Sequence, residues 1–135
     1  MSSPSEQVIV VDAANVIGSR PDGWWRDRPG AARRLLLKLA ALQQQLPETS
    51  IIVILEGAAR RAVDDPPLDL GPLKVVLAPA SGDDTITEVT AESRTPTSPP
   101  AVTVVTADRG LRQRVEPLGA TTTGPNWLWT QLDSL

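Results

Sequence analysis

The hydrophobic residues of this chain form short, nearly unbroken runs, separated by longer stretches in which apolar and polar positions mix. We predict strands at residues 8–11, 51–55, 74–78, 102–106 and 121–123. Most of these runs do not alternate with polar residues, which is typical of strands covered on both faces in a parallel sheet.

Helical spacing prevails between the strands. From residue 29 to residue 46 apolar residues recur at intervals of three and four, and Pro29 and Pro47 suit the first turn and the end of a helix. We predict further helices over residues 81–93, over 111–117 and from about 125 onwards. Loops are expected over residues 13–23 and 58–72, the second with room for one helical turn.

The alternation of strands and helices predicts an α/β protein with a parallel sheet. A chain of 135 residues can bury one ordinary core but not two, so we expect a single domain over residues 1–135. Residues 95–100 are rich in Pro and Thr, but this segment is too short to separate domains, and we expect it to join a helix to the next strand.

The composition limits the chemistry. The chain has no Cys and no His, which excludes thiolate chemistry, disulfides and imidazole ligands. A bound metal would take oxygen ligands from Asp, Glu, Asn or Ser, and such ligands favour hard ions such as Mg²⁺ or Mn²⁺.

The formal net charge of −3 argues against a wholly basic nucleic-acid-binding surface, but eleven of the thirteen cationic residues are Arg, which suits local phosphate recognition. No signal-like segment opens the chain, and no apolar stretch approaches the roughly 20 residues that cross a bilayer. We therefore expect a soluble, cytoplasmic protein without membrane contact. The sequence leaves a homodimer open and indicates no protein partner.

Acidic residues follow four of the predicted strands: Asp12, Glu56, Asp83 with Asp84, and Asp108. Because the carboxyl ends of parallel strands meet at one edge of the sheet, we expect these acids to gather there. Clustered carboxylates repel one another, and a divalent cation would offset that repulsion. The pattern therefore predicts a metal site suited to hydrolysing a phosphodiester.

Each acid also has a plainer interpretation. An Asp or Asn after a strand often caps a helix or forms a turn, and Ser81 with Asp84 makes a capping-box pattern. Asn15 could bond a metal-bound water, a carboxylate or a phosphate, or could favour a left-handed turn. Four such coincidences at consecutive strand ends are less expected than one, which favours the site.

Three segments around these acids resemble the NYN domains, relatives of the PIN nucleases, and in particular their YacP-like branch. They read Val-Val-Asp-Ala-Ala-Asn-Val-Ile from residue 10, Asp-Asp-Thr-Ile from residue 83, and Val-Thr-Ala-Asp-Arg-Gly-Leu from residue 105. The resemblance covers residues 8 to about 123. It implies a three-layer α/β/α sandwich with a central parallel sheet of about five strands, and metal-dependent endoribonuclease activity on RNA with Mg²⁺ or Mn²⁺.

The resemblance also implies roles for single residues. Asp12, Asp83 and Asp108 match the acids of the family motif and are the expected catalytic residues and metal ligands. We expect Glu56 and Asp84 to support the metal, directly or through water.

Two departures from the family pattern leave alternatives open. Glu56 stands where Asp is common, and Thr87 stands where an acid often follows the Ile. A non-catalytic RNA-binding or regulatory module with an impaired acidic site is therefore the second functional hypothesis. A receiver-like or dehalogenase-like phosphotransfer domain would need either a suitably placed Lys or a second acid two residues after Asp12, where this chain has Ala14.

Four polar residues near the expected edge are candidates for contact with RNA: Asn15, Arg20, Arg26 and Arg109. Guanidinium groups there could hold phosphates, although a salt bridge to one of the sixteen acids is as probable for any single Arg.

The four Trp residues are the only aromatic side chains. Trp24 and Trp25 could stack on unpaired bases, but packing at the start of the first long helix is the favoured interpretation. We expect Trp127 and Trp129 to pack the closing helix against the core.

Overall fold

The structure is a computed structural model that describes residues 7–64, 68–93 and 101–135. Its strands form one five-stranded sheet in the order β3-β2-β1-β4-β5, in which every neighbouring pair is parallel. The strands are β1 (Gln7–Asp12), β2 (Thr49–Leu55), β3 (Lys74–Leu77), β4 (Ala101–Val105) and β5 (Thr121–Thr123). The five predicted strands are therefore confirmed, while the expected connector at residues 95–100 lies outside the described residues.

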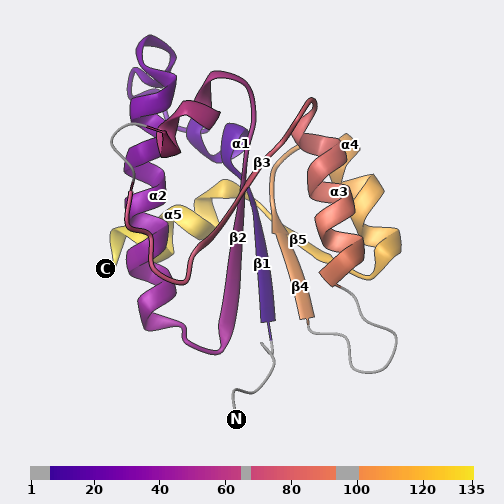
Figure 1. The fold of residues 1–135 in the computed structure, drawn as a ribbon. Helices are drawn as coiled ribbons and strands as arrows, with labels where there is room; N and C mark the ends of the chain where they lie inside the picture. The colour runs from indigo at the N-terminus through magenta and orange to yellow at the C-terminus, as the bar shows by residue number, and fades with distance from the viewer. Residues whose placement is uncertain (1–6, 65–67, 94–100) are drawn as a thin grey trace.

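Helices cover both faces of this sheet (Figure 1). One face carries α1 (Ala13–Gly18), α2 (Arg28–Gln45) and α5 (Pro125–Asp133), and the other carries α3 (Gly82–Ser93) and α4 (Arg109–Val115). Short 3-10 helices lie at η1 (Trp24–Arg26), η2 (Gly57–Val63) and η3 (Glu116–Leu118). This is the three-layer α/β/α sandwich that the sequence led us to expect.

The central strand explains the unbroken apolar runs. Ile9 and Val11 of β1 belong to the core cluster under α1, α2 and α5, whereas Val8 and Val10 belong to the cluster under α3 and α4. Because successive strand residues point to opposite faces, a strand buried on both faces must be apolar throughout. Each such side chain contributes about 1.5–3 kcal/mol when it is fully buried.

The segment directly after β1 is helical, so the loop predicted from residue 13 is wrong over α1. Asp12 caps this helix through its side chain, which accepts a hydrogen bond from the backbone N–H of Asn15. Ala13, Val16 and Ile17 are buried beneath it. A helix of six residues is too short to give a periodic signal, which is why the sequence pattern did not indicate it.

The tryptophans divide between packing and exposure. Trp24 packs against the core, as expected, and Trp129 is buried in α5. Trp127 is 40% exposed, so the prediction that it packs the closing helix is wrong, because it lies on the outer side of α5. Trp25 is also exposed, at 52%.

The sheet order places a crevice at one edge. From β1 the chain builds β2 and β3 on one side, and after β3 it passes through α3 to β4 on the other side of β1. The order therefore reverses between β1 and β4, and the carboxyl ends of strands at such a switch point are where open α/β sheets bind ligands. Within the described ranges no helix has the length and apolarity needed to cross a bilayer.

Candidate functional site

Asp12 lies at this switch point, as the last residue of β1, and is only 7% exposed. Its Oδ2 accepts a hydrogen bond from the Thr106 hydroxyl at 2.9 Å, and its Oδ1 a longer one of 3.4 Å from the Asn15 N–H. Burial raises the pKa of Asp12 to about 6; these two hydrogen bonds lower it, and the charges of Asp83 and Glu56 raise it further. Asp12 is thus a buried acid whose ionised form a nearby cation would stabilise.

Thr106 follows β4 and is fully buried. Besides donating to Asp12, its hydroxyl accepts a hydrogen bond from the Asp108 N–H at 3.1 Å, so one side chain connects the loops that carry two of the predicted acids. The sequence analysis assigned no role to Thr106. The available signal was its place in the Thr-Ala-Asp-Arg segment, and only the pairing of β1 with β4 shows what it contacts.

Asp108 caps α4, because its Oδ1 accepts from the Leu111 N–H at 2.9 Å. The capping interpretation is therefore correct for this residue, which is exposed and uses only one carboxylate oxygen for the cap. Asn15 braces the same region: its Oδ1 accepts from the Ala107 N–H at 2.9 Å. No described residue other than Gly has a positive φ, so the left-handed turn considered for Asn15 is wrong.

Glu56 approaches from the end of β2. Its Oε2 accepts a hydrogen bond from the Gly82 N–H at the start of α3. A Cβ on Gly82 would lie 2.6 Å from this oxygen, so a larger residue here would displace the Glu56 carboxylate. The contact joins the loop after β2 to the helix that carries Asp83 and Asp84.

Asp83 interacts electrostatically with acids from two other segments, Asp108 after β4 and Glu56 after β2. Its pKa is raised first by burial and then by the charges of Asp108 and Glu56, while the charge of Arg114 lowers it. The structure therefore brings Asp12, Glu56, Asp83 and Asp108 into one field at the sheet edge, as the strand-end pattern predicted.

Asp84 has a different partner. Its Oδ1 lies 2.9 Å from Nη2 of Arg114, and this exposed ion pair links α3 to α4. The capping box considered for Ser81 and Asp84 is wrong, because the Ser81 hydroxyl accepts from the Asp83 N–H instead. The supporting metal role predicted for Asp84 would require this ion pair to open.

The donor chemistry fits a hard divalent cation. Among the described residues, none of Asp12, Glu56, Asp83 and Asp108 has an ion-pair partner within 4 Å, and repulsion contributes to the raised pKa values of Asp12 and Asp83. Across residues 7–64, 68–93 and 101–135, no three acidic side chains converge closely enough to hold one ion by themselves. Mg²⁺ commonly takes one or two carboxylates and completes its octahedron with water and substrate phosphate. The residues present thus fit an ion held by two carboxylates and water.

The arginines predicted to contact RNA differ in whether they already have partners within the protein. Arg20 forms an ion pair with Asp133 at 2.6 Å and stacks over Trp129 at 4.0 Å, so it fastens the loop after α1 to α5. Arg26 and Arg109 are exposed. Arg112, which the sequence analysis did not single out, donates twice to the Thr106 carbonyl, at 3.0 and 2.8 Å, and holds α4 on the end of β4.

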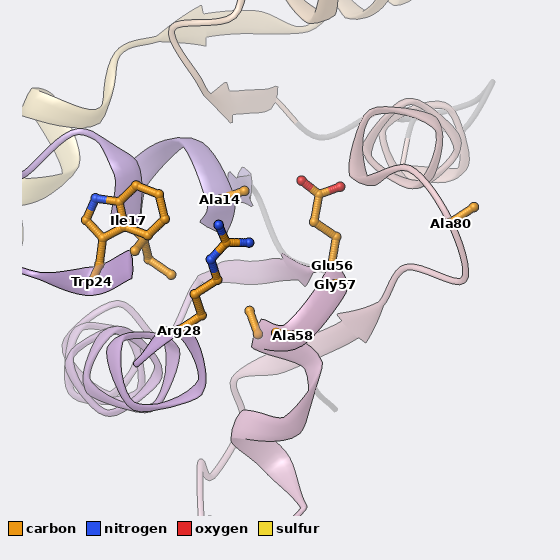
Figure 2. Close-up of a pocket in the computed structure, with 9 residues that line it drawn as sticks. Ala14, Ile17, Trp24, Arg28, Glu56, Gly57, Ala58 and Ala80 are labelled. Atoms are coloured by element: carbon orange, nitrogen blue, oxygen red, sulfur yellow. The ribbon is translucent and has the colours of Figure 1, made fainter. Parts of the chain in front are cut away.

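A cavity of about 400 Å³ adjoins the acidic edge. Figure 2 shows Trp24 and Ile17 on one side of it, with Arg28 and Glu56 extending from different segments toward Ala14. Glu56 therefore faces both the other acidic side chains of the site and this cavity.

The arrangement of strands and helices recurs in solved structures. The chain shares the fold of Rae1. The crystal structure of Rae1 (YacP) from Bacillus subtilis aligns with a TM-score of 0.78 at 17% identity, over 94% of this chain and 74% of that chain. A mutant of the same protein gives 0.72 at 18% identity, with the same coverage.

This likeness confirms the fold of a YacP protein, as the three motifs implied, and at such low identity it establishes the fold alone. No model of a known protein family matches the chain. No curated protein sequence matches it either.

Proposed function

We propose that this protein is a metal-dependent endoribonuclease of the NYN/PIN type, of the YacP-like branch, that hydrolyses phosphodiester bonds in RNA. The observation that carries the proposal is the buried Asp12 at the switch point between β1 and β4, with the carboxylates of Asp83 and Glu56 in its field. The fold shared with Rae1 (YacP) supports it.

In this proposal Asp12, Asp83 and Asp108 are the catalytic residues and metal ligands, of which two would hold an ion directly and the third through water, with Glu56 and Asp84 in support. A bound Mg²⁺ or Mn²⁺ would lower the pKa of a water molecule and neutralise charge on the phosphodiester. The chain's own residues prepare the site for this ion.

Thr106 orients Asp12 through a hydrogen bond, which lowers the pKa that burial raises and so favours the ionised form that binds a cation. Asn15 retains its amide N–H groups, because it uses its oxygen to accept from Ala107. These N–H groups and the exposed Arg26 and Arg109 would hold phosphates of the RNA. Arg20 would contribute only if it released Asp133.

The test is RNA cleavage by the Asp12→Asn variant. Asn keeps one side-chain oxygen, which can still cap the helix by accepting from the Asn15 N–H, while its amide N–H can donate to the Thr106 hydroxyl, so the fold should persist while the anionic ligand is lost. We expect the wild-type protein to cleave labelled RNA with Mn²⁺ and to stop with EDTA. The variant should be slower by more than about 100-fold, since even partners behind metal ligands contribute about 10–100-fold.

Asp22→Asn is the matched control, because Asp22 lies in the exposed loop after α1 and its side chain has no hydrogen bond to the described residues. It should cleave like the wild type. Cleavage that persists in EDTA, or in Asp12→Asn, would contradict the proposal.

The second candidate is a non-catalytic RNA-binding module. The Thr87 hydroxyl donates to the Asp83 carbonyl at 2.7 Å, so this position supplies a helix contact where the family pattern often has an acid. Titration with Mn²⁺ separates the two functions: a folded protein that binds RNA but no Mn²⁺ would favour this candidate over the nuclease.

A further inference from the structure

We propose that the cavity beside Glu56 binds an unpaired guanine base of the RNA and so selects where the chain acts. The inference deepens the proposed nuclease function and rests on it for the class of ligand. The volume of about 400 Å³ lies within the range of about 300–1,000 Å³ typical of small-ligand sites. Guanine is inferred from the walls and from the two charged groups at the ends of the cavity.

The walls suit a flat heterocycle. Ile17 and Trp24 line one side, and the small side chains of Ala58 and Ala80 leave the opposite side open (Figure 2). Trp24 is already held in place, because it packs against the core and meets Trp25 edge-on at 5.8 Å. Aromatic and apolar walls of this kind take up unpaired bases by stacking and contact. A fixed wall also lowers the entropy lost on binding.

The charged groups provide a donor and an acceptor. The Arg28 guanidinium lies 5.5 Å from the Trp24 ring centroid and forms no ion pair with any described residue, so its donors remain available to a ligand. Glu56 uses Oε2 to accept from Gly82, which leaves Oε1 available. In Figure 2 both groups extend toward the space beside Ala14.

This pairing of charges favours guanine over the other bases. Guanine presents two acceptors, O6 and N7, to which a guanidinium donates bidentately, and its opposite edge presents N–H donors to a carboxylate. Adenine presents an amino donor where guanine has O6, and that group would face the donors of Arg28. Uracil and cytosine lack the purine N7 and would fill less of the cavity.

The position of the cavity would make the choice of base matter for cleavage. Glu56 lines the cavity and also lies within electrostatic range of Asp12 and Asp83. A base held against Glu56 would therefore place its own phosphate beside the acidic edge. We expect cleavage next to an unpaired guanine.

The experiment measures the binding of fluorescently labelled pentanucleotides of RNA by anisotropy, in EDTA so that cleavage makes no contribution. One oligonucleotide is all uridine, and three others carry a single G, A or C at the centre. We expect the G-containing oligonucleotide to bind about tenfold more tightly than the others, the order of one bidentate base contact.

Substitutions of three alanines and of Arg28 test whether the preference for G arises in the cavity. Ala58→Leu and Ala80→Leu add bulk at exposed positions that line the cavity and should remove the preference for G. Ala41→Leu makes the same change at an exposed position of α2 outside the cavity and should keep it. Arg28→Lys keeps the charge but loses the bidentate donor, so it should weaken binding of the G oligonucleotide more than binding of the all-uridine oligonucleotide.

The inference is overturned if the wild-type protein binds all four oligonucleotides equally, or if both cavity variants, folded by circular dichroism, keep the preference. Its failure is distinguishable from failure of the proposed function. Metal-dependent cleavage without a preference for G would contradict the guanine site and support the nuclease. A preference for G without cleavage under any divalent metal would contradict the nuclease and support the guanine site.

Discussion

Asp12 ionises in a place where water stabilises its charge poorly. Burial is the largest cause of its raised pKa, and the Thr106 hydroxyl is the largest of the contributions that lower it. The same hydroxyl accepts from the Asp108 N–H. Two acids of the proposed site therefore depend on one uncharged side chain.

Replacing Thr106 by Val should test this dependence. The isosteric change leaves Oδ2 of Asp12 and the N–H of Asp108 without their partner, so we expect the free energy of unfolding to fall by about 1–3 kcal/mol. The pKa of Asp12 should rise, and Mn²⁺ should bind more weakly. Urea unfolding and NMR titration of the Asp12 carboxyl measure these effects. Thr106→Ser keeps the hydroxyl and should stay near the wild type; equal losses in both variants would contradict the assignment.

The raised pKa of Asp12 also predicts how stability depends on pH. Because the folded-state pKa is about 6 against an ordinary 3.8, ionised Asp12 destabilises the folded state, and this penalty grows as the pH rises from about 4 to about 6 and is constant above. In EDTA, the free energy of unfolding of Asp12→Asn relative to that of the wild type should rise by an amount on the order of 3 kcal/mol between pH 4 and pH 7. Denaturant unfolding at both pH values measures the difference. An unchanged difference would mean that Asp12 titrates normally.

At the scale of elements, Gln43 joins α2 to β2. Its buried side chain accepts from the Ile51 N–H at 2.8 Å and donates to the carbonyls of Thr49 and Leu46, at 2.6 and 3.1 Å. One side-chain amide therefore bonds three backbone groups at the connection between α2 and β2. The apolar spacing of α2 was visible in the sequence, but this contact was not.

Gln43→Leu should destabilise the protein without touching the acidic edge. The substitution leaves the buried Ile51 N–H without its partner and removes one bond from the Thr49 carbonyl, while the Leu46 carbonyl still accepts from the Thr49 N–H. We expect a loss of about 1–3 kcal/mol, the cost of one buried unpaired group. Guanidinium unfolding measures it. Gln45→Leu, at an exposed position of the same helix, is the control and should change stability little. A Gln43→Leu variant as stable as the control would show that the three bonds contribute nothing net.

The elements that the sequence predicted well are those with long or continuous signals. The strands β1, β2 and β4 are buried on both faces, and α2 has eighteen residues with most of its leucines on one face, so the pattern itself identifies them. The short α1 was missed, because its helical start depends on the Asp12 side chain. Trp127 was placed in the core from its apolar character, but its side of α5 faces outwards.

For the protein as a whole, we expect a divalent ion bound at the acidic edge to stabilise the folded state. Four carboxylates at one edge share a repulsive field that a bound ion would neutralise. We expect Mn²⁺ to raise the thermal midpoint, with about 2.7 kcal/mol of added stability at a concentration 100 times the dissociation constant. Differential scanning calorimetry measures the shift. NaCl at equal ionic strength and the Asp12→Asn variant should show little of it; an equal shift in either would contradict a specific site.

Local patterns along the chain were enough to predict the alternation of buried strands and helices, the acids that follow four strands, and the three YacP-like segments. The contacts between these elements became visible only in the folded protein. Thr106 meets Asp12 across 94 positions because β4 pairs with β1, and Arg20 is drawn to Asp133 because α5 packs beside α1. Such contacts depend on strand order and helix placement, which residue spacing along the chain does not encode.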